Sequence, residues 1–193
     1  DIIFEKQSWF QEEVNNHPEI IDGKFKFLKD YMELLTFKQK SIFFRKELYE
    51  NKIIPETIEI TINRNEILTS SFYQLNPSSS KTLDKLKSNI HAKFRNEPGF
   101  DMGGLTRDWF TSLVKELFNT GYALFVSNEN FRSFQPNPAS DVNDHHLEYF
   151  EFAGMIIARA IIGGICVDAH LTRSFIKQIL GVELTLDDLE DID

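Results

Sequence analysis

The sequence predicts a mainly α-helical α+β domain with a small β-sheet or hairpins. Apolar residues recur at helical spacing in three long segments, 24–49, 105–118 and 147–162. The segment 57–62 instead alternates β-branched apolar and polar residues, which is the period of a half-buried strand. A glycine-rich corner at 99–104 then joins a second expected strand to one of the helices.

Length and composition narrow the class of protein. The 193 residues are 41% hydrophobic and include 18 phenylalanines, enough to bury a substantial core. We expect an N-terminal helical segment at 1–23 and one domain at 24–193. The formal net charge of -9 argues against partners rich in phosphate, both nucleic acids and anionic membranes. The single cysteine, Cys166, excludes a disulfide framework and a Cys-rich zinc site, and it predicts a cytoplasmic or nuclear location.

In the first half of the chain the patterns predict short elements separated by breakers. In order, we expect a helix at 3–14, two helices within 24–49 with a break near Thr36, a strand at 57–62, a turn at 63–65, a short helix at 70–75, a polar loop at 76–80, a short helix at 81–89 and a strand at 90–95 that pairs with the first.

The second half is predicted to be more helical. The segment 105–118 has one apolar face, and 124–134 reads as an irregular hairpin ended by Pro136-Asn137-Pro138. The segment 147–162 is apolar almost all round, which predicts a central buried helix. A further helix covers 172–180 and ends at Gly181, and Thr185 starts a final helical turn with Asp188 three residues later.

The glycine-rich corner is the most distinctive local motif. Its members are Glu97, Gly99, Asp101, Gly103, Gly104 and Arg107. A helix N-terminus preceded by glycines can bind phosphate, but this spacing matches neither G-x-G-x-x-G nor G-x-x-x-x-G-K-[ST]. A structural turn is favoured, in which the glycines supply positive φ or close packing. Glu97 and Arg107 are expected to form an ion pair that fixes the corner.

Three other groups of reactive side chains have ordinary structural interpretations. Asp141, Asp144, His145 and His146 resemble metal ligands, yet adjacent histidines face different sides of a helix. Asn143 or Asp144 is instead expected to cap the long helix. Cys166 lies among glycine and aliphatic residues, which favours an inert buried thiol. The acidic residues within 187–193 lack the spacing of a calcium loop. We therefore expect no catalytic, cofactor-binding or metal site.

The segment Tyr122-Ala123-Leu124-Phe125 combines aromatic residues with neighbouring polar turns. That composition is typical of a recognition surface, although the same aromatics could simply close the core.

A series of motifs then resembles one family over most of the chain. The motifs are Phe37-x-x-Lys40-x-x-Phe43-Phe44-Arg45-x-x-Leu48, Phe94-x-x-Glu97-x-Gly99-x-Asp101-x-Gly103-Gly104-Leu105-x-Arg107-Asp108-Trp109-Phe110, Tyr122-Ala123-Leu124-Phe125, Asn137-Pro138, His146-Leu147-x-Tyr149-Phe150-x-Phe152-x-Gly154, Thr172-Arg173-Ser174-Phe175-x-x-x-Ile179-Leu180-Gly181 and Asp188-Leu189-Glu190-x-x-Asp193. In order and spacing they resemble the N-terminal lobe of HECT-type ubiquitin-protein ligases, above all the very large ones.

The resemblance implies a two-lobe enzyme that takes ubiquitin from a conjugating enzyme as a cysteine thioester and passes it to a substrate lysine. The implied partners are ubiquitin, the conjugating enzyme and protein substrates; the charge, as above, argues against nucleic acid and membrane. The chain would be an excised piece, the large subdomain of the lobe, without the docking subdomain or the catalytic cysteine, and inactive alone. It would contact a second ubiquitin through Tyr122, Leu124 and Phe125. The alternative is a non-catalytic interaction module with the same fold.

Overall fold

The structure, a computed structural model, describes residues 12–14, 16–17, 23, 26–52, 57–75, 88–97, 103–128 and 133–189. The chain forms two compact units, residues 1–53 and 54–193, and each is described by itself. The boundary predicted after residue 23 concerns the start of the family domain, which this division does not test. The helix predicted at 3–14, the loop at 76–80 and the helix at 81–89 lie wholly or mostly outside the described residues.

The described residues of the first unit include helical residues at 12–14 and 16, two 3-10 turns and one long helix. The bounds of the last three are η2 Lys26–Lys29, η3 Met32–Leu34 and α3 Phe37–Lys52. The predicted break near Thr36 is confirmed by a reciprocal capping box, in which the Thr36 amide donates to Gln39 Oε1 (2.9 Å) and the Gln39 amide to Thr36 Oγ1 (3.3 Å). The helix predicted before this break is wrong: two 3-10 turns stand there, separated by the non-helical Tyr31 (φ -130°, ψ 53°).

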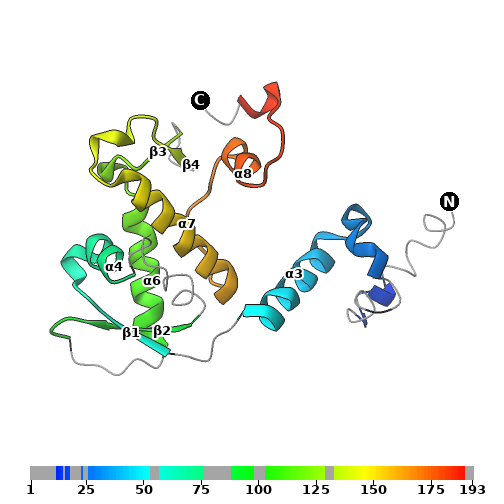
Figure 1. Cartoon of the computed structure of the whole chain (residues 1–193), viewed down its shortest axis with the longest axis horizontal. Helices are drawn as coiled ribbons and strands as arrows, with labels where there is room; N and C mark the ends of the chain where they lie inside the picture. The colour runs from blue at the N-terminus through cyan, green and yellow to red at the C-terminus, as the bar shows by residue number, and fades with distance from the viewer. Residues whose placement is uncertain are drawn as a thin grey trace. The chain divides into compact units, whose positions relative to one another are not determined.

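The second unit holds the remaining elements (Figure 1). In chain order they are β1 Thr57–Ile62, η4 Arg64–Glu66, α4 Ile67–Leu75, β2 Asn89–Phe94, α6 Gly104–Leu117, η5 Thr120–Tyr122, β3 Phe125–Ser127, β4 Phe134–Pro136, η6 Ser140–Val142, α7 His146–Gly163, α8 Arg173–Ile179 and η7 Leu186–Leu189. The mainly helical α+β class is confirmed, as are the predicted strands and the helices that follow them.

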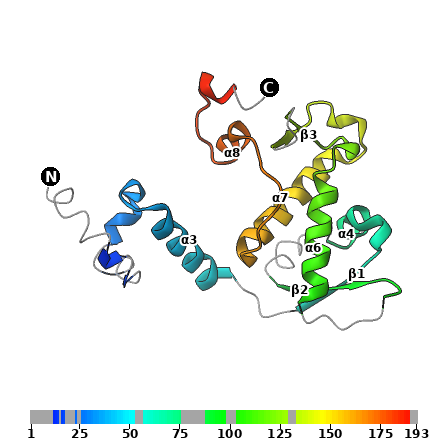
Figure 2. The same cartoon turned by 180° about the vertical axis from the view of Figure 1, so that it is seen from behind.

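The strands β1 and β2 pair in parallel, with Ile60 opposite Ala92 and Ile62 opposite Phe94. These four side chains are buried, and the alternate residues of each strand are more exposed, as the alternation in the sequence predicts. Helix α6 stands on this two-stranded sheet, which Figure 2 shows from the side on which α6 is in front. The pairing of β1 with β2 ends at Phe94, so the corner that leads into α6 begins after this residue.

Thr106, in the first turn of α6, supplies β2 with hydrogen bonds that a third strand would otherwise provide. The Ala92 amide donates to Thr106 Oγ1 (2.9 Å), and Thr106 Oγ1 donates to the Ile90 carbonyl (3.2 Å). An unpaired strand edge leaves buried polar groups without partners, which is costly. The threonine hydroxyl therefore anchors α6 to the sheet, a role that the sequence analysis did not foresee.

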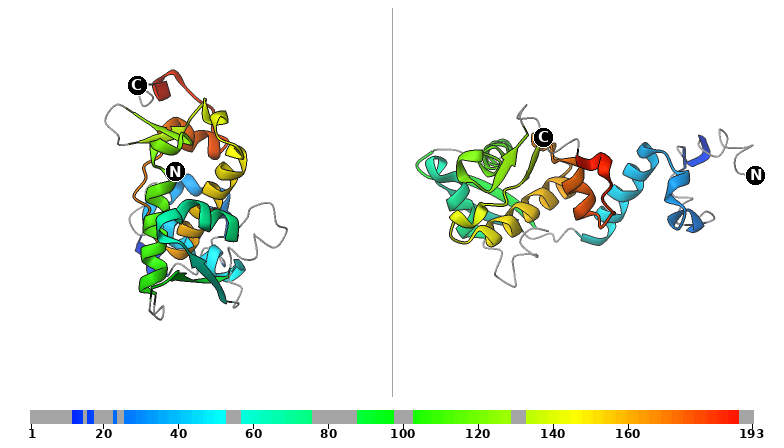
Figure 3. Two further views of the ribbon diagram at one scale, coloured as in Figure 1. Left: turned by 90° about the vertical axis from the view of Figure 1, so that its left-hand side faces the viewer. Right: turned by 90° about the horizontal axis from the view of Figure 1, so that it is seen from above.

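The core of this unit is built around one face of α6. Trp109, Phe110, Leu113 and Leu117 are at most 2% exposed, and they pack among residues of both strands, α4 and α7. Figure 3 (left) shows the hairpin β3–β4 and α8 at the opposite end of this unit from β1 and β2. Helix α6 thus runs from the sheet at one end of this unit to the hairpin at the other. Its apolar face is buried along the way, as the sequence predicts.

Helix α7 is buried along one face, where its side chains include Phe152, Ala153 and Ile156. The expectation of burial all round is wrong, because Leu147 and Ile161 are 70% and 49% exposed and face away from the core. The helix ends in a Schellman motif at Gly164 (φ +61°), with the Ile165 amide donating to the Ala160 carbonyl (2.9 Å).

The last elements follow the predicted pattern. The hairpin β3–β4 is antiparallel and ends at Pro136, and Phe134 also forms a bridge to Leu171. Thr172 caps α8 by accepting the Phe175 amide (3.3 Å). After α8, Gly181 (φ +66°) closes a second Schellman motif, as its place in the sequence predicts.

Candidate functional site

The predicted corner is only partly within the described residues. Gly99 and Asp101 lie outside them, while Glu97, Gly103, Gly104 and Arg107 are described. Gly103 is the N-cap of α6 with φ +95°, so the interpretation of this glycine as a conformational device is confirmed. The corner turns the chain from β2 into α6.

Arg64, in η4, is the cation that organises this corner. Its Nε and Nη2 donate to the two oxygens of Glu97 (2.6 and 3.0 Å), its Nη2 lies 2.9 Å from Asp108 Oδ2, and its guanidinium carbon lies 3.7 Å from the centre of the Phe94 ring. The hydrogen bonds from Arg64 lower the pKa of Glu97. The expected Glu97–Arg107 ion pair is therefore wrong, because the bidentate geometry is satisfied by an arginine 33 residues away.

Substitution of the two corner glycines should have opposite effects on stability. A Cβ added to either would meet no atom within 4 Å, so the difference comes from the backbone alone. Gly103→Ala forces an L-residue to φ +95° and should lower the free energy of unfolding by about 1–3 kcal/mol. Gly104→Ala, inside the helix, should leave it unchanged or raise it by up to ~1 kcal/mol. Urea unfolding of both variants, followed by circular dichroism, tests this; equal losses would contradict it.

The second predicted site, around Tyr122, is held in place by three asparagine side chains. Asn119 caps η5 by accepting the Gly121 amide (3.0 Å). Asn143 Nδ2 donates to the Tyr122 carbonyl (2.7 Å), and Asn137 Nδ2 donates to the Ala123 carbonyl (2.8 Å). These bonds hold Ala123 in the left-handed conformation (φ +53°). Neither role was predicted: Asn143 was expected to cap the long helix, and Asn137 stands in the Asn137-Pro138 motif with no role assigned.

The three aromatic and aliphatic residues predicted to contact a partner have different surroundings. Tyr122 is 38% exposed, whereas Leu124 and Phe125 are each 2% exposed. Phe125 packs on Phe118 and Phe150, with ring centroids 4.6 and 5.4 Å apart. The prediction that Leu124 and Phe125 touch a partner is corrected: they form the core beneath the turn, and Tyr122 alone offers a side chain to a partner.

Tyr122 also borders a polar groove of about 290 Å³ between η4, α6 and η5. The groove is lined by Arg64, Asn65, Ile67, Ser112, Lys115, Glu116 and Tyr122. Partial burial, followed by the charge of Glu116 and a hydrogen bond to it, raises the pKa of the Tyr122 hydroxyl. The neutral form of the hydroxyl is therefore favoured in this groove.

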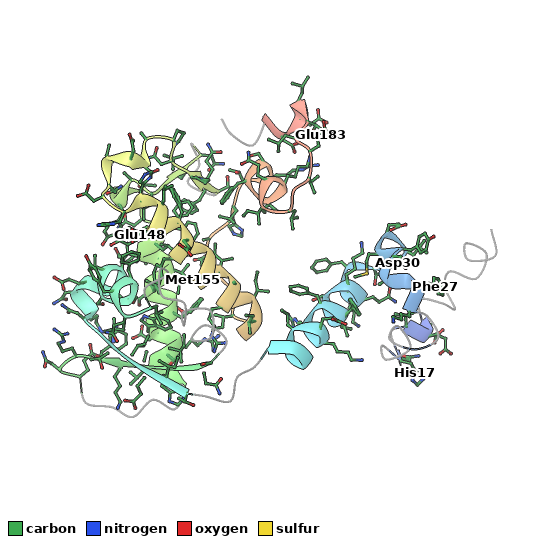
Figure 4. The ribbon with its side chains drawn as sticks, in the orientation of Figure 1. His17, Phe27, Asp30, Glu148, Met155 and Glu183 are labelled. Carbon is green, nitrogen blue, oxygen red and sulfur yellow. The ribbon has the colours of Figure 1, made fainter. Side chains whose placement is uncertain are left out.

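Tyr149, which is half-buried, lies close to Tyr122, and the exposed Val142 and Leu147 belong to the same stretch of the chain as Tyr149. Tyr149 stacks on Phe72 (4.2 Å), and burial together with the nearby Tyr73 and Tyr122 raises its pKa. Val142, next to the Asn143 anchor, is 73% exposed, and Leu147 on the first turn of α7 is 70% exposed. Glu148, which Figure 4 labels near the start of α7, follows Leu147 directly in the chain. Exposed aromatic and aliphatic side chains with a polar border are typical of protein-binding surfaces.

The neighbouring histidines face different partners, as predicted. His145 Nδ1 lies 3.0 Å from Glu148 Oε1, and His146 Nδ1 lies 3.1 Å from Ser140 Oγ. The prediction of Asn143 or Asp144 as helix cap is wrong: His145 (φ +62°) is the N-cap of α7, because Asn143 is used to hold Tyr122. Among the described residues, no three His, Cys, Asp or Glu side chains are grouped as a metal ion would need.

Cys166 is exposed, which corrects the prediction of a buried thiol. After α7 the chain alternates, with Ile165, Val167 and Ala169 packed against the core and the residues between them facing solvent. Cys166 falls on the outer side of this alternation and lines a cavity of about 270 Å³ with Phe110, Val114 and Phe134. Separately, no helix of the described segments is both long and apolar enough to cross a bilayer.

Comparison with known proteins identifies similar sequences. The family model described as HECT-domain (ubiquitin-transferase) matches residues 111–193. The chain is 35% identical over 182 residues to the E3 ubiquitin-protein ligase UPL2 of Arabidopsis thaliana, 34% over 182 residues to TOM1 of Saccharomyces cerevisiae and 34% over 177 residues to HUWE1 of Mus musculus. These matches cover 93%, 93% and 90% of the chain, but only 5%, 6% and 4% of the respective relatives.

Proposed function

Because residues 111–193 are part of a HECT domain and the chain is similar to large ubiquitin-protein ligases, we propose that it serves as the scaffold of such a ligase. In this proposal the parent protein accepts ubiquitin from a conjugating enzyme as a cysteine thioester and transfers it to a substrate lysine. The chain itself holds parts of the enzyme in position, since thioester exchange requires two sulfur atoms to meet. The rigid connection of sheet, α6 and hairpin supports this role.

The nucleophile of this reaction is proposed to lie elsewhere in the parent protein. Cys166, the single cysteine of the chain, is exposed at the edge of an apolar cavity, and its neighbours there include Lys115 and Asp168. No described histidine lines that cavity to act as a base for the thiol. Taken alone, the chain should therefore be inactive.

The test uses the parent protein with charged conjugating enzyme and ubiquitin, and it looks for a ubiquitin adduct that reducing agent removes. We expect an adduct on the parent that survives Cys166→Ser and is lost when a cysteine outside this chain becomes serine. No adduct with any of several conjugating enzymes would favour the alternative, a non-catalytic interaction module with the same fold. Loss of the adduct in Cys166→Ser would contradict this proposal and show that the nucleophile is Cys166 itself.

We further propose that ubiquitin itself contacts the surface around Tyr122. The 38% exposed ring supports this, as do the exposed Val142 next to Asn143 in the sequence and the hydrogen bonds by which Asn137 and Asn143 hold the turn. Leu124 and Phe125 contribute indirectly, by fixing the turn from below. A cytoplasmic or nuclear location is part of the same proposal, since the reaction needs a reduced thiol.

Tyr122→Ala should weaken binding of isotope-labelled ubiquitin to the chain by about 10-fold or more, because exposed tyrosines at interface centres carry much of the binding energy. An NMR titration measures this. Tyr31→Ala is the matched control, since Tyr31 is 52% exposed but belongs to the first unit. Tyr122→Phe, which keeps the ring, should bind nearly normally. Equal affinity in Tyr122→Ala and the unaltered chain would contradict the proposed contact.

A further inference from the structure

The segment between α8 and η7 offers one hydroxyl with unusual surroundings. Residues 178–187 are all exposed, and 182–185 have no regular secondary structure. Figure 4 labels Glu183 on this stretch. Thr185, at its end, donates through its amide (2.7 Å) and its hydroxyl (3.0 Å) to Asp188 Oδ2. Thr185 is thus an exposed residue whose hydroxyl is tied to one carboxylate.

We propose that Thr185 is a phosphorylation site for an acidophilic Ser/Thr kinase. Asp187, Asp188, Glu190, Asp191 and Asp193 all follow it, and it is the one Ser or Thr of the sequence with an acidic residue three positions later. A kinase with a basic substrate cleft would be selected by this run through charge complementarity. The proposal concerns a second property of the chain and does not depend on the ligase function.

The nearest alternative acceptors lack these features. Thr172 and Ser174 are 2% and 5% exposed, and Thr172 is occupied in capping α8. Three residues after them stand Phe175 and Lys177, which a basic cleft would not favour. Exposure and sequence therefore both distinguish Thr185 from hydroxyls only a few residues away.

The reaction itself is ordinary phosphoryl transfer. The Thr185 oxygen forms a bond to the γ-phosphorus of ATP while the bond from that phosphorus to the β-phosphate oxygen breaks, leaving ADP. The hydroxyl proton passes to the kinase's catalytic base. The oxygen can reach the kinase only when its hydrogen bond to Asp188 opens. Asp188 is 2% exposed and also bonds Lys177 and the Thr185 amide, so its carboxylate can face the basic cleft only when η7 opens from α8 as well.

The phosphate would reverse the charge of a small cluster. Lys177 Nζ lies 2.7 Å from Asp188 Oδ2, and Arg173 Nε lies 3.4 Å from Oδ1, so two cations face one carboxylate. Arg173 is 65% exposed, and Oδ1 is buried with no hydrogen-bond partner in the described part of the chain, so this cation can move to a new anion. A phosphate of about -2 charge on Thr185 would repel the Asp188 carboxylate and compete with it for Lys177 and Arg173. The contacts of η7 with α8 should therefore loosen.

The experiment incubates the 193-residue chain with ATP and a purified acidophilic Ser/Thr kinase and maps phosphate by mass spectrometry. We expect one phosphate, at Thr185, which Thr185→Val abolishes. Asp188→Ala separates the two requirements, because alanine offers the Thr185 hydroxyl no acceptor and also removes the recognised acid. We expect it to slow phosphorylation by about 10-fold, the worth of one charge-assisted contact; faster phosphorylation would show that the acid is not recognised and overturn that part.

A second measurement examines the consequence of the modification. Hydrogen exchange of the Thr185 amide should be about 10-fold faster in the phosphorylated chain, since its hydrogen bond to a charged acceptor is lost. The Phe175 amide, which donates to Thr172, is the internal control. Unchanged exchange at Thr185 would overturn the loosening. Phosphorylation of a peptide of residues 180–193, with none of the folded chain under the same conditions, would overturn the site.

Discussion

Trp109→Ala should lower the free energy of unfolding of the second unit by about 3–5 kcal/mol, the usual loss for a large aromatic side chain in a core. Trp109 is 1% exposed on the buried face of α6, and its ring meets Phe110 edge-on at 6.0 Å. Its indole Nε1 also donates to Ser71 Oγ (2.9 Å), which joins α6 to α4. The substitution therefore opens a cavity and removes a buried hydrogen bond between two helices.

Urea unfolding followed by circular dichroism measures this effect. Trp109→Phe is the matched variant, because it keeps most of the aromatic contacts but removes the indole donor. It should cost about 1 kcal/mol for the hydrogen bond, in addition to the smaller volume lost. Adding Ser71→Ala to Trp109→Phe should recover part of that loss. A loss under about 1 kcal/mol in Trp109→Ala would show that the core around α6 is not packed as described.

Asp188→Asn should remove a large part of the decrease in the free energy of unfolding that occurs between pH 4 and pH 2. Hydrogen bonds from Lys177, then from the Thr185 amide, lower the pKa of Asp188 from 3.8 to about 2. The folded state therefore binds fewer protons than the unfolded chain between these values, so the stabilisation is complete above about pH 4 and is lost as pH falls toward 2. The amide introduced by Asp188→Asn would carry no charge at any pH and would leave Lys177 without its carboxylate.

The comparison is the free energy of unfolding at pH 7, 4, 3 and 2. The unaltered chain should be more stable than Asp188→Asn at pH 7, and the difference should shrink steadily from pH 4 to pH 2. Asp187→Asn is the control, because the neighbouring Asp187 is exposed and takes part in no ion pair within the described residues. A difference between Asp188→Asn and the unaltered chain that stays constant down to pH 2 would show that the charge of Asp188 contributes nothing.

Predictions that depend on neighbouring residues in the sequence were mostly confirmed. The alternation in β1, the apolar face of α6, the break at Thr36 and the glycine that ends α8 all follow from local geometry and local hydrogen bonds. A strand repeats every two residues and a helix every 3.6, so such patterns are visible before any tertiary contact is known.

Predictions that depend on distant residues were less successful. Glu97 bonds Arg64 rather than Arg107, although Arg107 is nearer in sequence. Helix α7 exposes Leu147, and Cys166 faces solvent within an apolar stretch. The sequence indicates that Glu97 is an acid but not which distant cation it meets. For Leu147 and Cys166, it indicates an apolar segment but not which side of that segment packs on the core.

The sequence by itself determined the fold class, most element types and the family motifs, because these depend on periodicity, on capping residues and on the order of short patterns. Only the tertiary structure decided which part of the Tyr122–Phe125 motif is available to a partner. Tyr122 is exposed while Leu124 and Phe125 are buried, because Asn137 and Asn143 hold the backbone of the turn from distant positions in the chain. Contacts between residues far apart in sequence set that orientation, and no local pattern encodes them.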